Sequence, residues 1–269
     1  MSEQIADCRV EPGQKAKLAA RSTSAKFGLD RKTSEAQLAE LTAALSILHN
    51  RLWAEQKRSV LLVLQGLDAS GKDGTIKRVF TGLNPQGCTV HSFKAPNDED
   101  LAHDYLWRVH NVLPPRGYIG IFNRSHYEDA VTTKVLGIIN DKERERRHQQ
   151  INDFERILTE EGMTLLKVFL HLGKDEQRKR LQARLDDPEK RWKFRLDDLE
   201  TRSHWDEYQR LYDETITATS TKWSPWHIVP ADHKWVSGHV VASLLVDALE
   251  ALDPQTPAPA ENLDGIVVE

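Results

Sequence analysis

One glycine-rich run constrains the fold of this chain more than any other feature. It follows an apolar segment, 60–65, directly, precedes a segment of helical pattern over 75–83, and reads Gly66-Leu67-Asp68-Ala69-Ser70-Gly71-Lys72-Asp73-Gly74-Thr75. A continuous apolar run without polar alternation is typical of a strand buried on both faces, as in a parallel sheet. A strand, a glycine-rich turn and a helix in that order predict a loop that binds phosphate.

The residue types in this loop suit a phosphate group. Gly66 and Gly71 let the backbone curl so that successive N–H groups point into one concavity. The N-terminus of the following helix adds about half a positive charge, and Lys72 adds a mobile full charge. The alternative is a tight strand-to-helix turn with a lysine facing solvent. The residues expected to bind phosphate are Gly66, Ala69, Ser70, Gly71, Lys72, Asp73, Gly74 and Thr75.

Two carboxylates depart from the usual pattern of such a loop. The residue after the lysine is usually Ser or Thr, whose hydroxyl binds Mg²⁺, and here it is Asp73. Asp68 also lies within the loop. An anion beside phosphate is unfavourable unless a divalent cation lies between the two. Asp68 is therefore a candidate Mg²⁺ ligand, and the alternative is a carboxylate that caps the turn.

A second polar run follows another apolar segment, 118–122, and extends from Asn123 to Asp129. In open α/β sheets ligands bind beyond the carboxyl ends of strands. Arg124 is expected to grip a phosphate, while Asp129 or Glu128 would hold a metal or orient an acceptor. The alternative is that both acids are helix N-terminal charges and that Arg124 is their ion-pair partner.

The remaining chain alternates strand and helix patterns, which predicts one α/β domain with a mostly parallel sheet. A capping box of Ser34 and Gln37 is expected to begin a helix. A stripe of leucines on this helix is expected to face the core, and a short coiled-coil seam is the alternative. The stripe consists of Leu38, Leu41, Leu45, Leu48 and Leu52. Other strands are expected at 89–93, 118–122, 164–171 and 227–229. Other helices are expected near 98–112, 141–161, 174–186, 203–219 and 235–252.

We divide the chain into three parts. An irregular segment over 1–33 precedes a domain over 34–252, and a Pro-rich tail over 253–269 is expected to be extended. A basic stretch lies within the domain. Its first part, 178–184, is expected to be a solvated face, and the part over 188–200 is expected to be a lid that Trp192 and Phe194 anchor.

Composition excludes several classes of protein. Lys and Arg number 37 against 41 Asp and Glu, a net charge of −4. Proteins that bind nucleic acid are usually basic, so the acidic net charge and the phosphate loop favour a lid over nucleic-acid binding for residues 188–200. No window approaches the roughly 18 apolar residues of a membrane helix, and residues 1–15 lack the apolar core of a signal peptide. Cys8 and Cys88 cannot form a disulfide scaffold, and no Cys/His cluster has zinc spacing. A cytoplasmic enzyme or binding protein is expected.

Several motifs in order resemble the polyphosphate kinase 2 family. They are GLDASGKDG at 66–74, SFKAP at 92–96, FNRSHYED at 122–129, KRWKF at 190–194 and VPADHKW at 229–235. The resemblance implies a P-loop kinase fold similar to thymidylate kinase, with a mostly parallel sheet sandwiched by helices and a helical lid. It also implies reversible, Mg²⁺-dependent phosphoryl transfer between inorganic polyphosphate and a nucleotide.

The resemblance assigns roles to particular residues. Asp68 and Lys72 match the family's Walker A carboxylate and lysine, Asp129 matches its Walker B carboxylate, and Asp68 and Asp129 would hold Mg²⁺. Arg124 matches the arginine that contacts the transferring phosphates, and Arg191 with Lys193 matches the basic lid. A basic path for the polymer has weaker candidates, which are Lys77, Arg78 and Lys94. The candidates for the nucleotide site are Lys94, Asn123, Arg124 and Glu128.

The acceptor is expected to be an adenine nucleotide, with guanine nucleotides as a second option. Asn123 and Glu128 resemble class III members of the family, which accept both AMP and ADP. The family also suggests a homodimer or homotetramer. Two alternatives remain open from the residues alone. One is an ATP-dependent kinase of a nucleotide or small metabolite, and the other is a binder of phosphate polymers without activity.

Overall fold

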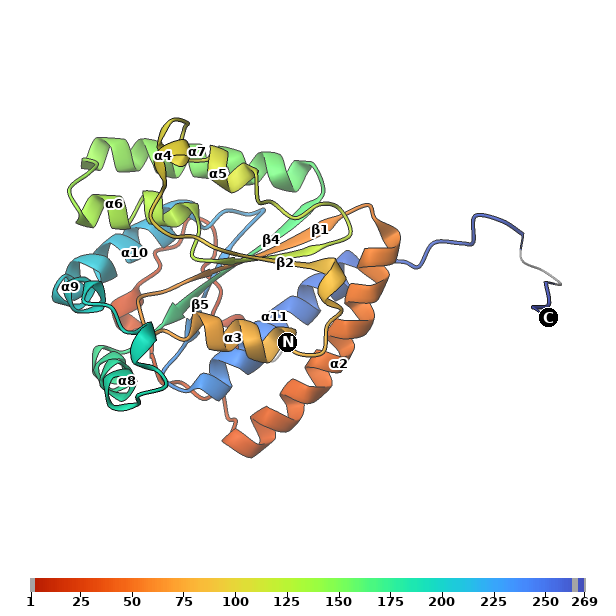
Figure 1. Ribbon diagram of the computed structural model, residues 1–269, viewed down its shortest axis with the longest axis horizontal. Helices are drawn as coiled ribbons and strands as arrows, with labels where there is room; N and C mark the ends of the chain where they lie inside the picture. Colours follow the sequence, from red (N-terminus) through yellow and green to blue (C-terminus); the bar gives the residue numbers. More distant parts are fainter. Residues whose placement is uncertain (1–2, 263–265, 269) are drawn as a thin grey trace.

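Five parallel strands form a single sheet at the centre of the molecule (Figure 1). The computed structural model describes residues 3–262 and 266–268. The strand order is β2-β3-β1-β4-β5, and all five strands predicted from the sequence are confirmed to within one residue at each end. The strands are β1 (Ser59–Gln65), β2 (Cys88–Ser92), β3 (Ile119–Asn123), β4 (Met163–His171) and β5 (Trp226–Pro230).

Helices cover both faces of this sheet. The longer ones are α2 (Arg31–Glu55), α3 (Lys72–Phe80), α7 (Asp141–Glu160), α8 (Lys174–Asp186), α10 (Trp205–Thr219) and α11 (Lys234–Leu252). The shorter ones are α1 (Glu3–Ala6), α4 (Asp98–Leu101), α5 (Trp107–His110), α6 (Thr132–Val135) and α9 (Asp197–Ser203). Single 3-10 turns are η1 (Leu18–Ala20), η2 (Pro85–Gly87), η3 (His126–Asp129) and η4 (Arg191–Lys193). The helix expected near 98–112 is thus two short helices, α4 and α5.

The start of α2 corrects the predicted capping box. The N-cap is Asp30, whose side chain accepts a hydrogen bond from the Thr33 amide at 2.8 Å. Ser34 lies inside the helix instead, where it is buried and its hydroxyl donates to the Trp235 carbonyl at 3.1 Å. Leu45 and Leu52 are fully buried on the face that packs against α11. The stripe therefore faces the core, as predicted, and the coiled-coil alternative is wrong.

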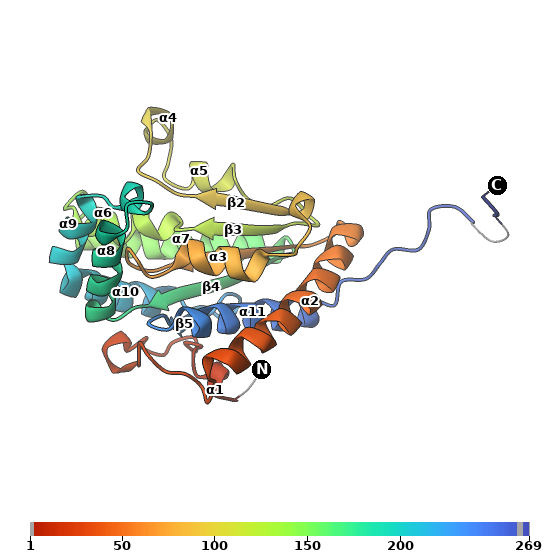
Figure 2. The same ribbon diagram turned by 60° about the horizontal axis from the view of Figure 1, so that its bottom comes forward.

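Alternate residues of β1 belong to different hydrophobic cores. Val60, Leu62 and Leu64 pack with α2, α3 and α11 on one face, whereas Leu61 and Val63 pack with α7 and α10 on the other. Figure 2 shows α3, α11 and α2 in front of the sheet and α7 behind it. Because α3 follows β1 and α7 follows β3, neighbouring strands send their connections to opposite faces, which opens a crevice at their carboxyl ends.

Helix α11 corrects one expectation about composition. Among residues 3–262 and 266–268 it is the one helix long and apolar enough to cross a membrane, although the sequence was expected to hold no such window. In the structure 67% of that window is buried, and α11 packs against α2, α3 and the sheet. This degree of burial is typical of a helix in the core of a folded domain.

Both terminal segments contact the domain. The N-terminal segment pairs with β5, because the Val10 amide donates to the Trp226 carbonyl at 2.8 Å and the Ile228 amide donates to the Cys8 carbonyl at 2.7 Å. After α11 the Gln255 amide donates to Glu55 at 2.9 Å. The tail then extends away from the body (Figures 1 and 2). Residues 1–2, 263–265 and 269 of the expected terminal segments lie outside the described residues.

Candidate active site

A cleft of about 1990 Å³ opens at the carboxyl ends of β1, β2 and β3. Its lining comes from the glycine loop, from the segment after β2, from the polar run after β3, and from the segment between α8 and α10. Binding pockets for small ligands usually measure about 300–1,000 Å³. The cleft is therefore large enough for more than one phosphorylated molecule.

The glycine loop has the backbone conformation that its sequence predicts. Gly66 and Gly71 have φ angles of 147° and 103°. A Cβ at Gly66 would lie 2.9 Å from the Leu170 carbonyl oxygen of β4, so only glycine fits where the loop leaves the sheet. Ala69 also has a positive φ, 63°, a conformation that is unfavourable for alanine unless its surroundings hold it. Helix α3 begins at Lys72, three residues earlier than expected.

Lys72 lies beneath the loop. Its ammonium group donates to the carbonyls of Gly66 at 2.7 Å and Leu67 at 3.3 Å. The side chain is buried, and burial together with the nearby charge of Arg124 lowers the pKa of Lys72 to about 8. A lysine in this state is only partly protonated above neutral pH, and an approaching phosphate anion would favour its charged form.

Arg124 lies between two carboxylates at the end of β3. Its guanidinium donates to Asp68 of the glycine loop and to Glu128 at 3.3 Å. The charge of Glu128 raises the pKa of Arg124, as does that of Asp68, despite the burial that opposes it. Arg124 has a φ of 64°, and strained backbone in a non-glycine residue is typical of functional sites. The two motifs predicted from the sequence therefore meet at this arginine.

Asp129 has a different partner. It forms an ion pair of 3.0 Å with Arg108 of α5, and both side chains are about 90% buried, with 9% and 10% exposed. Burial raises the pKa of Asp129, while the charge and hydrogen bond of Arg108 lower it. Arg108 also donates to the Lys94 carbonyl at 2.9 Å. Sequence reasoning missed Arg108, because α5 carries no motif and the partner lies 21 positions away.

The other predicted residues divide between the cleft and its surroundings. Asn123 donates to the Asp73 carboxylate at 2.7 Å, which joins the two motifs a second time. The predicted residues that line the cleft are Gly66, Asp68, Ala69, Ser70, Gly71, Lys72, Asp73, Gly74, Arg78, Lys94, Asn123, Arg124, Glu128, Asp129 and Lys193.

Three predicted residues do not line the cleft. Thr75 is buried inside α3 and its hydroxyl has no hydrogen-bond partner. Lys77 is exposed in the last turn of α3. Arg191 is exposed in η4 and donates to the Leu185 carbonyl at 2.7 Å. Its neighbour Lys193 lines the cleft, with its ammonium 5.1 Å from the ring centre of Trp192.

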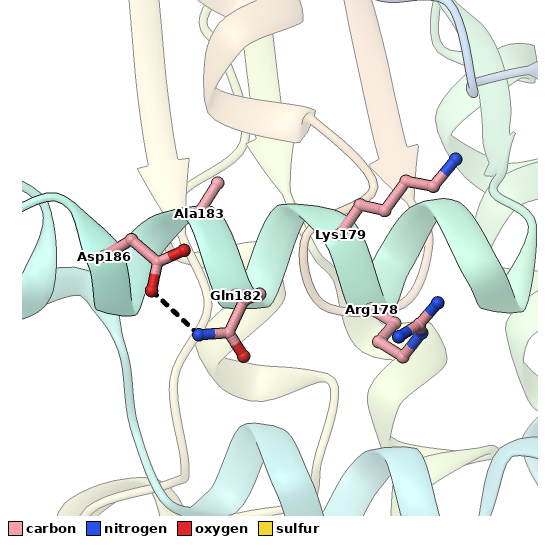
Figure 3. A pocket seen from close by; sticks show the side chains of 5 residues that line it. All are labelled: Arg178, Lys179, Gln182, Ala183 and Asp186. Carbon is pink, nitrogen blue, oxygen red and sulfur yellow. Dashed lines mark hydrogen bonds between the residues drawn. The ribbon is translucent and has the colours of Figure 1, made fainter.

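The basic face over 178–184 requires a correction. Arg178 and Lys179 are exposed, as expected, and line a shallow hollow of about 340 Å³ on α8 (Figure 3). Arg180 is buried, however, and its guanidinium donates to the carbonyls of Ala69 and Ser70. The expectation of a solvated face is wrong for Arg180, since two of its partners are loop carbonyls that lie 111 and 110 positions away in the sequence.

The carboxylates of the cleft fit a magnesium ion only in part. The described part of the chain has no group of three His, Cys, Asp or Glu side chains placed to hold a metal. Magnesium in phosphoryl-transfer sites is usually bound by one or two carboxylates together with substrate phosphates and water. Asp68 and Asp129 fit that donor set. Each carboxylate forms an ion pair with an arginine in this structure, and a bound cation would take the place of the arginine as its positively charged partner.

Fold and cleft together define a class of protein. A parallel sheet whose central strand leads into a glycine loop, with a lysine beneath the loop and an arginine at the end of the neighbouring strand, is the arrangement of a P-loop kinase. A sequence model described as Polyphosphate kinase 2 (PPK2) matches residues 28–257. The chain belongs to this family, and the resemblance and the fold predicted from the sequence are confirmed.

Individual relatives agree with the family. The chain is 47% identical over 232 residues to the AMP/ADP-polyphosphate phosphotransferase of Meiothermus ruber, covering 86% of this chain and 87% of that protein. It is 40% identical to the ADP-polyphosphate phosphotransferase of Rhodopseudomonas palustris, covering 79% and 78%. The crystal structure of Polyphosphate Kinase 2 from Arthrobacter aurescens TC1 matches with a TM-score of 0.89 at 40% identity, covering 95% of this chain and 92% of that one.

Proposed function

We propose that this protein is a polyphosphate:nucleotide phosphotransferase that moves the terminal phosphoryl group of inorganic polyphosphate to AMP and ADP, reversibly. One observation carries the proposal. The phosphate loop and the polar run after β3 meet at Arg124, between Asp68 and Glu128, in a chain of the polyphosphate kinase 2 family. The relative of highest identity described above is named for both AMP and ADP, which supports the acceptors expected from Asn123 and Glu128.

The proposed mechanism depends on alignment and charge neutralisation, because the transition state of phosphoryl transfer is loose and anionic. Lys72 and the amides of the loop would hold the terminal units of the polymer. Arg124 would neutralise the phosphoryl group in transfer. The acceptor is itself a phosphate that is largely ionised near pH 7, so the reaction needs no strong general base.

Magnesium is part of the proposal. Asp68 and Asp129 would hold it, and the ion would supply positive charge that screens donor phosphates from acceptor phosphates. Arg108 would contribute positive charge beside the same carboxylate, since it forms a buried ion pair with Asp129 in the wall of the cleft.

A basic path for the rest of the polymer is proposed along Arg78 and Lys193. Arg78 lines the cleft, and its Nε and Nη2 atoms are buried without hydrogen-bond partners. Burial and the charge of Arg180 lower the pKa of Arg78, so a phosphate chain would satisfy its donors and stabilise its charge. Lys94 and Asn123 are proposed to face the nucleotide. Lys77 and Thr75 have no support from the cleft geometry.

The lid, residues 188–200, is proposed to close over both substrates and to bring in Arg191, which lies outside the cleft lining in this structure.

Two further parts of the proposal rest on the family and the substrates. We propose a homodimer or homotetramer, measurable by light scattering after size-exclusion chromatography. We also propose a cytoplasmic location, because AMP, ADP and ATP are cytoplasmic metabolites.

The donor assay tests the function directly. Pure protein with Mg²⁺ receives either polyphosphate or ATP as donor, with AMP and then ADP as acceptor, and nucleotides are separated by chromatography. We expect polyphosphate to convert AMP to ADP and ADP to ATP. Turnover with ATP as the sole effective donor would favour an ATP-dependent kinase instead, and conversion of ADP alone would remove AMP from the proposed acceptors.

Replacement of Asp129 tests its proposed metal role. Asp129→Asn keeps the shape of the side chain and removes its charge, so we expect at least about a hundredfold lower kcat with an unchanged circular dichroism spectrum. Glu161→Gln is a matched control, because Glu161 is exposed and pairs with Arg116 away from the cleft. Near-normal turnover of Asp129→Asn would refute the assigned role.

A further inference from the structure

One guanidinium group of α8 uses all of its hydrogen-bond donors within the protein, two of them on the phosphate loop. Arg180 Nη1 donates to the carbonyls of Ala69 at 3.0 Å and Ser70 at 3.2 Å. Nη2 donates to the carbonyls of Ala231 at 2.7 Å and Asp232 at 2.9 Å. Nε donates to Glu176 at 2.9 Å. Arginine has five N–H donors, so none is left for a substrate although the side chain lines the cleft.

A second residue, one turn earlier on α8, extends this set of bonds. Gln177 is fully buried, and its amide donates to the Asp68 carbonyl at 3.0 Å. Residues 177 and 180 lie three positions apart, on one face of the helix. Three consecutive carbonyls of the loop, at residues 68, 69 and 70, therefore accept hydrogen bonds from a single helix.

The direction of these carbonyls determines the direction of the amides. A trans peptide places the carbonyl and the following N–H on opposite sides. When Arg180 holds the Ser70 carbonyl, the Gly71 N–H points the other way, toward the concavity where phosphate would lie. The left-handed conformation of Ala69, at φ 63°, is unfavourable by itself and persists only where neighbouring bonds hold it.

The Ser70 amide, which follows the Ala69 carbonyl, donates to the Leu67 carbonyl at 3.1 Å inside the loop. We propose that Arg180, together with Gln177, is a positioning residue that fixes the carbonyls of the phosphate loop so that the amides of Ala69 and Gly71 face the donor phosphate. The same side chains join the loop to two other parts of the molecule. Arg180 reaches the loop after β5. Gln177 accepts a bond of 3.0 Å from Arg202 of α9, the helix in which the lid ends. Closure of the lid and the shape of the loop are thereby coupled.

Substitution of Arg180 tests this role. We expect Arg180→Ala to raise the KM for polyphosphate about tenfold or more, because the loop carbonyls lose their charged donor, and to leave the KM for AMP nearly unchanged. Arg180→Lys keeps the charge but has three donors on one nitrogen, so it should be almost as defective. Methylguanidinium in solution should partly restore activity to Arg180→Ala, and the same compound should have no such effect on wild type.

A matched control separates geometry from charge. Arg178→Ala removes one positive charge from the same helix, on the exposed hollow of Figure 3, and should leave both KM values within about twofold. A folded Arg180→Lys with the wild-type KM for polyphosphate would overturn the proposal, since charge alone would then suffice. Arg180→Ala could fail to fold, and Gln177→Met is the second variant for that case. It removes the amide that bonds Asp68 and Arg202 without shortening the side chain. It should still raise that KM, and an unchanged KM would overturn the proposal.

The proposal uses polyphosphate as donor and so rests on the proposed function. Calorimetric binding of inorganic tripolyphosphate to wild type and to Arg180→Lys distinguishes the two. Absence of polyphosphate-dependent turnover in wild type would refute the function, whereas weaker tripolyphosphate binding by the variant would still support the positioning role. Equal binding by both proteins would refute that role even if wild type turns over polyphosphate.

Discussion

At the scale of a single residue, we expect Lys72 to make the proposed site sensitive to pH. Because burial lowers its pKa to about 8, the ammonium is charged below that pH and neutral above it. We expect kcat/KM for polyphosphate, which reports the free enzyme, to fall as pH rises through about 8. The measurement is an initial-rate profile over pH 6.5–9.5 at constant ionic strength, with free Mg²⁺ held constant.

Lys72→Arg provides the control for this profile. A guanidinium stays charged throughout the range, so the variant should lose the decline above pH 8 whatever its absolute rate. Persistence of the same decline in Lys72→Arg would show that another group, or the substrates themselves, causes it.

Gly66 illustrates a steric requirement at the same scale. Gly66→Ala would place a methyl group 2.9 Å from the Leu170 carbonyl, so the loop must move away from β4, and we expect a loss of at least about tenfold in kcat/KM together with a lower Tm. Gly82→Ala is the matched control, because Gly82 also has a positive φ, 93°, but nothing lies within 4 Å of its added Cβ. Equal effects of the two substitutions would mean that backbone strain, not the contact, is what matters.

Residues of the site differ in how far the sequence could predict them. Lys72, Asp68 and Arg124 belong to contiguous motifs that directly follow apolar strands, so their place at the carboxyl edge of the sheet follows from topology. Arg108 and Arg180 could not be found in that way. Their partners are a carboxylate and several carbonyls that only the folded chain brings near, and an arginine on a helix has the same local sequence whether it faces solvent or a loop.

At the scale of secondary-structure elements, a buried ion pair orients the turn that carries Glu128 and Asp129. Lys167 of β4 donates to Glu155 of α7 at 2.5 Å and to the hydroxyl of Tyr127 in η3 at 3.0 Å. Lys167 and Glu155 are both fully buried. Removal of one partner leaves an uncompensated charge, so we expect Glu155→Leu to lower the free energy of unfolding by about 3–5 kcal/mol, as measured by urea denaturation.

The double variant Glu155→Leu/Lys167→Met tests the cause of that loss. It removes both charges, so it should recover much of the lost stability. Arg156→Ala, on the exposed side of α7, removes a surface pair with Glu160 and should change stability little. A double variant that is less stable than Glu155→Leu would show that the pair stabilises the fold by itself.

Elements with one dominant signal were predictable from the sequence. The strands are apolar runs bounded by turns, and each was found to within one residue. Element ends were harder where two signals competed. Asp30 and Ser34 are both residues that cap helices, and only the tertiary bond from Ser34 to Trp235 shows that Ser34 lies inside α2.

At the scale of the whole molecule, the net charge of −4 conceals a cleft whose lining holds more Lys and Arg than Asp and Glu. Basic side chains reach it from α3, α5, α7, α8, α11, the segments after β2 and β3, and the lid. Composition averages over the whole chain, whereas the fold gathers more bases than acids at the carboxyl edge of the sheet. This excess of basic side chains suits a polyanion that binds along an extended path, with the acids left to bind a cation or to pair with the bases.

The lid is the part of the molecule that substrates are expected to order. Lys190, Trp192, Lys193 and Arg195 line the cleft. Trp192 is 77% exposed, so it does not anchor the segment as expected. Closure over an anionic polymer would bury this aromatic ring and pair the bases at once. In Asp129→Asn, which should bind substrates without turnover, polyphosphate with AMP is expected to slow hydrogen exchange across residues 188–200 several-fold, as measured by mass spectrometry, and to leave residues 38–52 of α2 unchanged. Protection of the glycine loop without any change across 188–200 would mean that substrates bind to an open cleft and that this segment does not act as a lid.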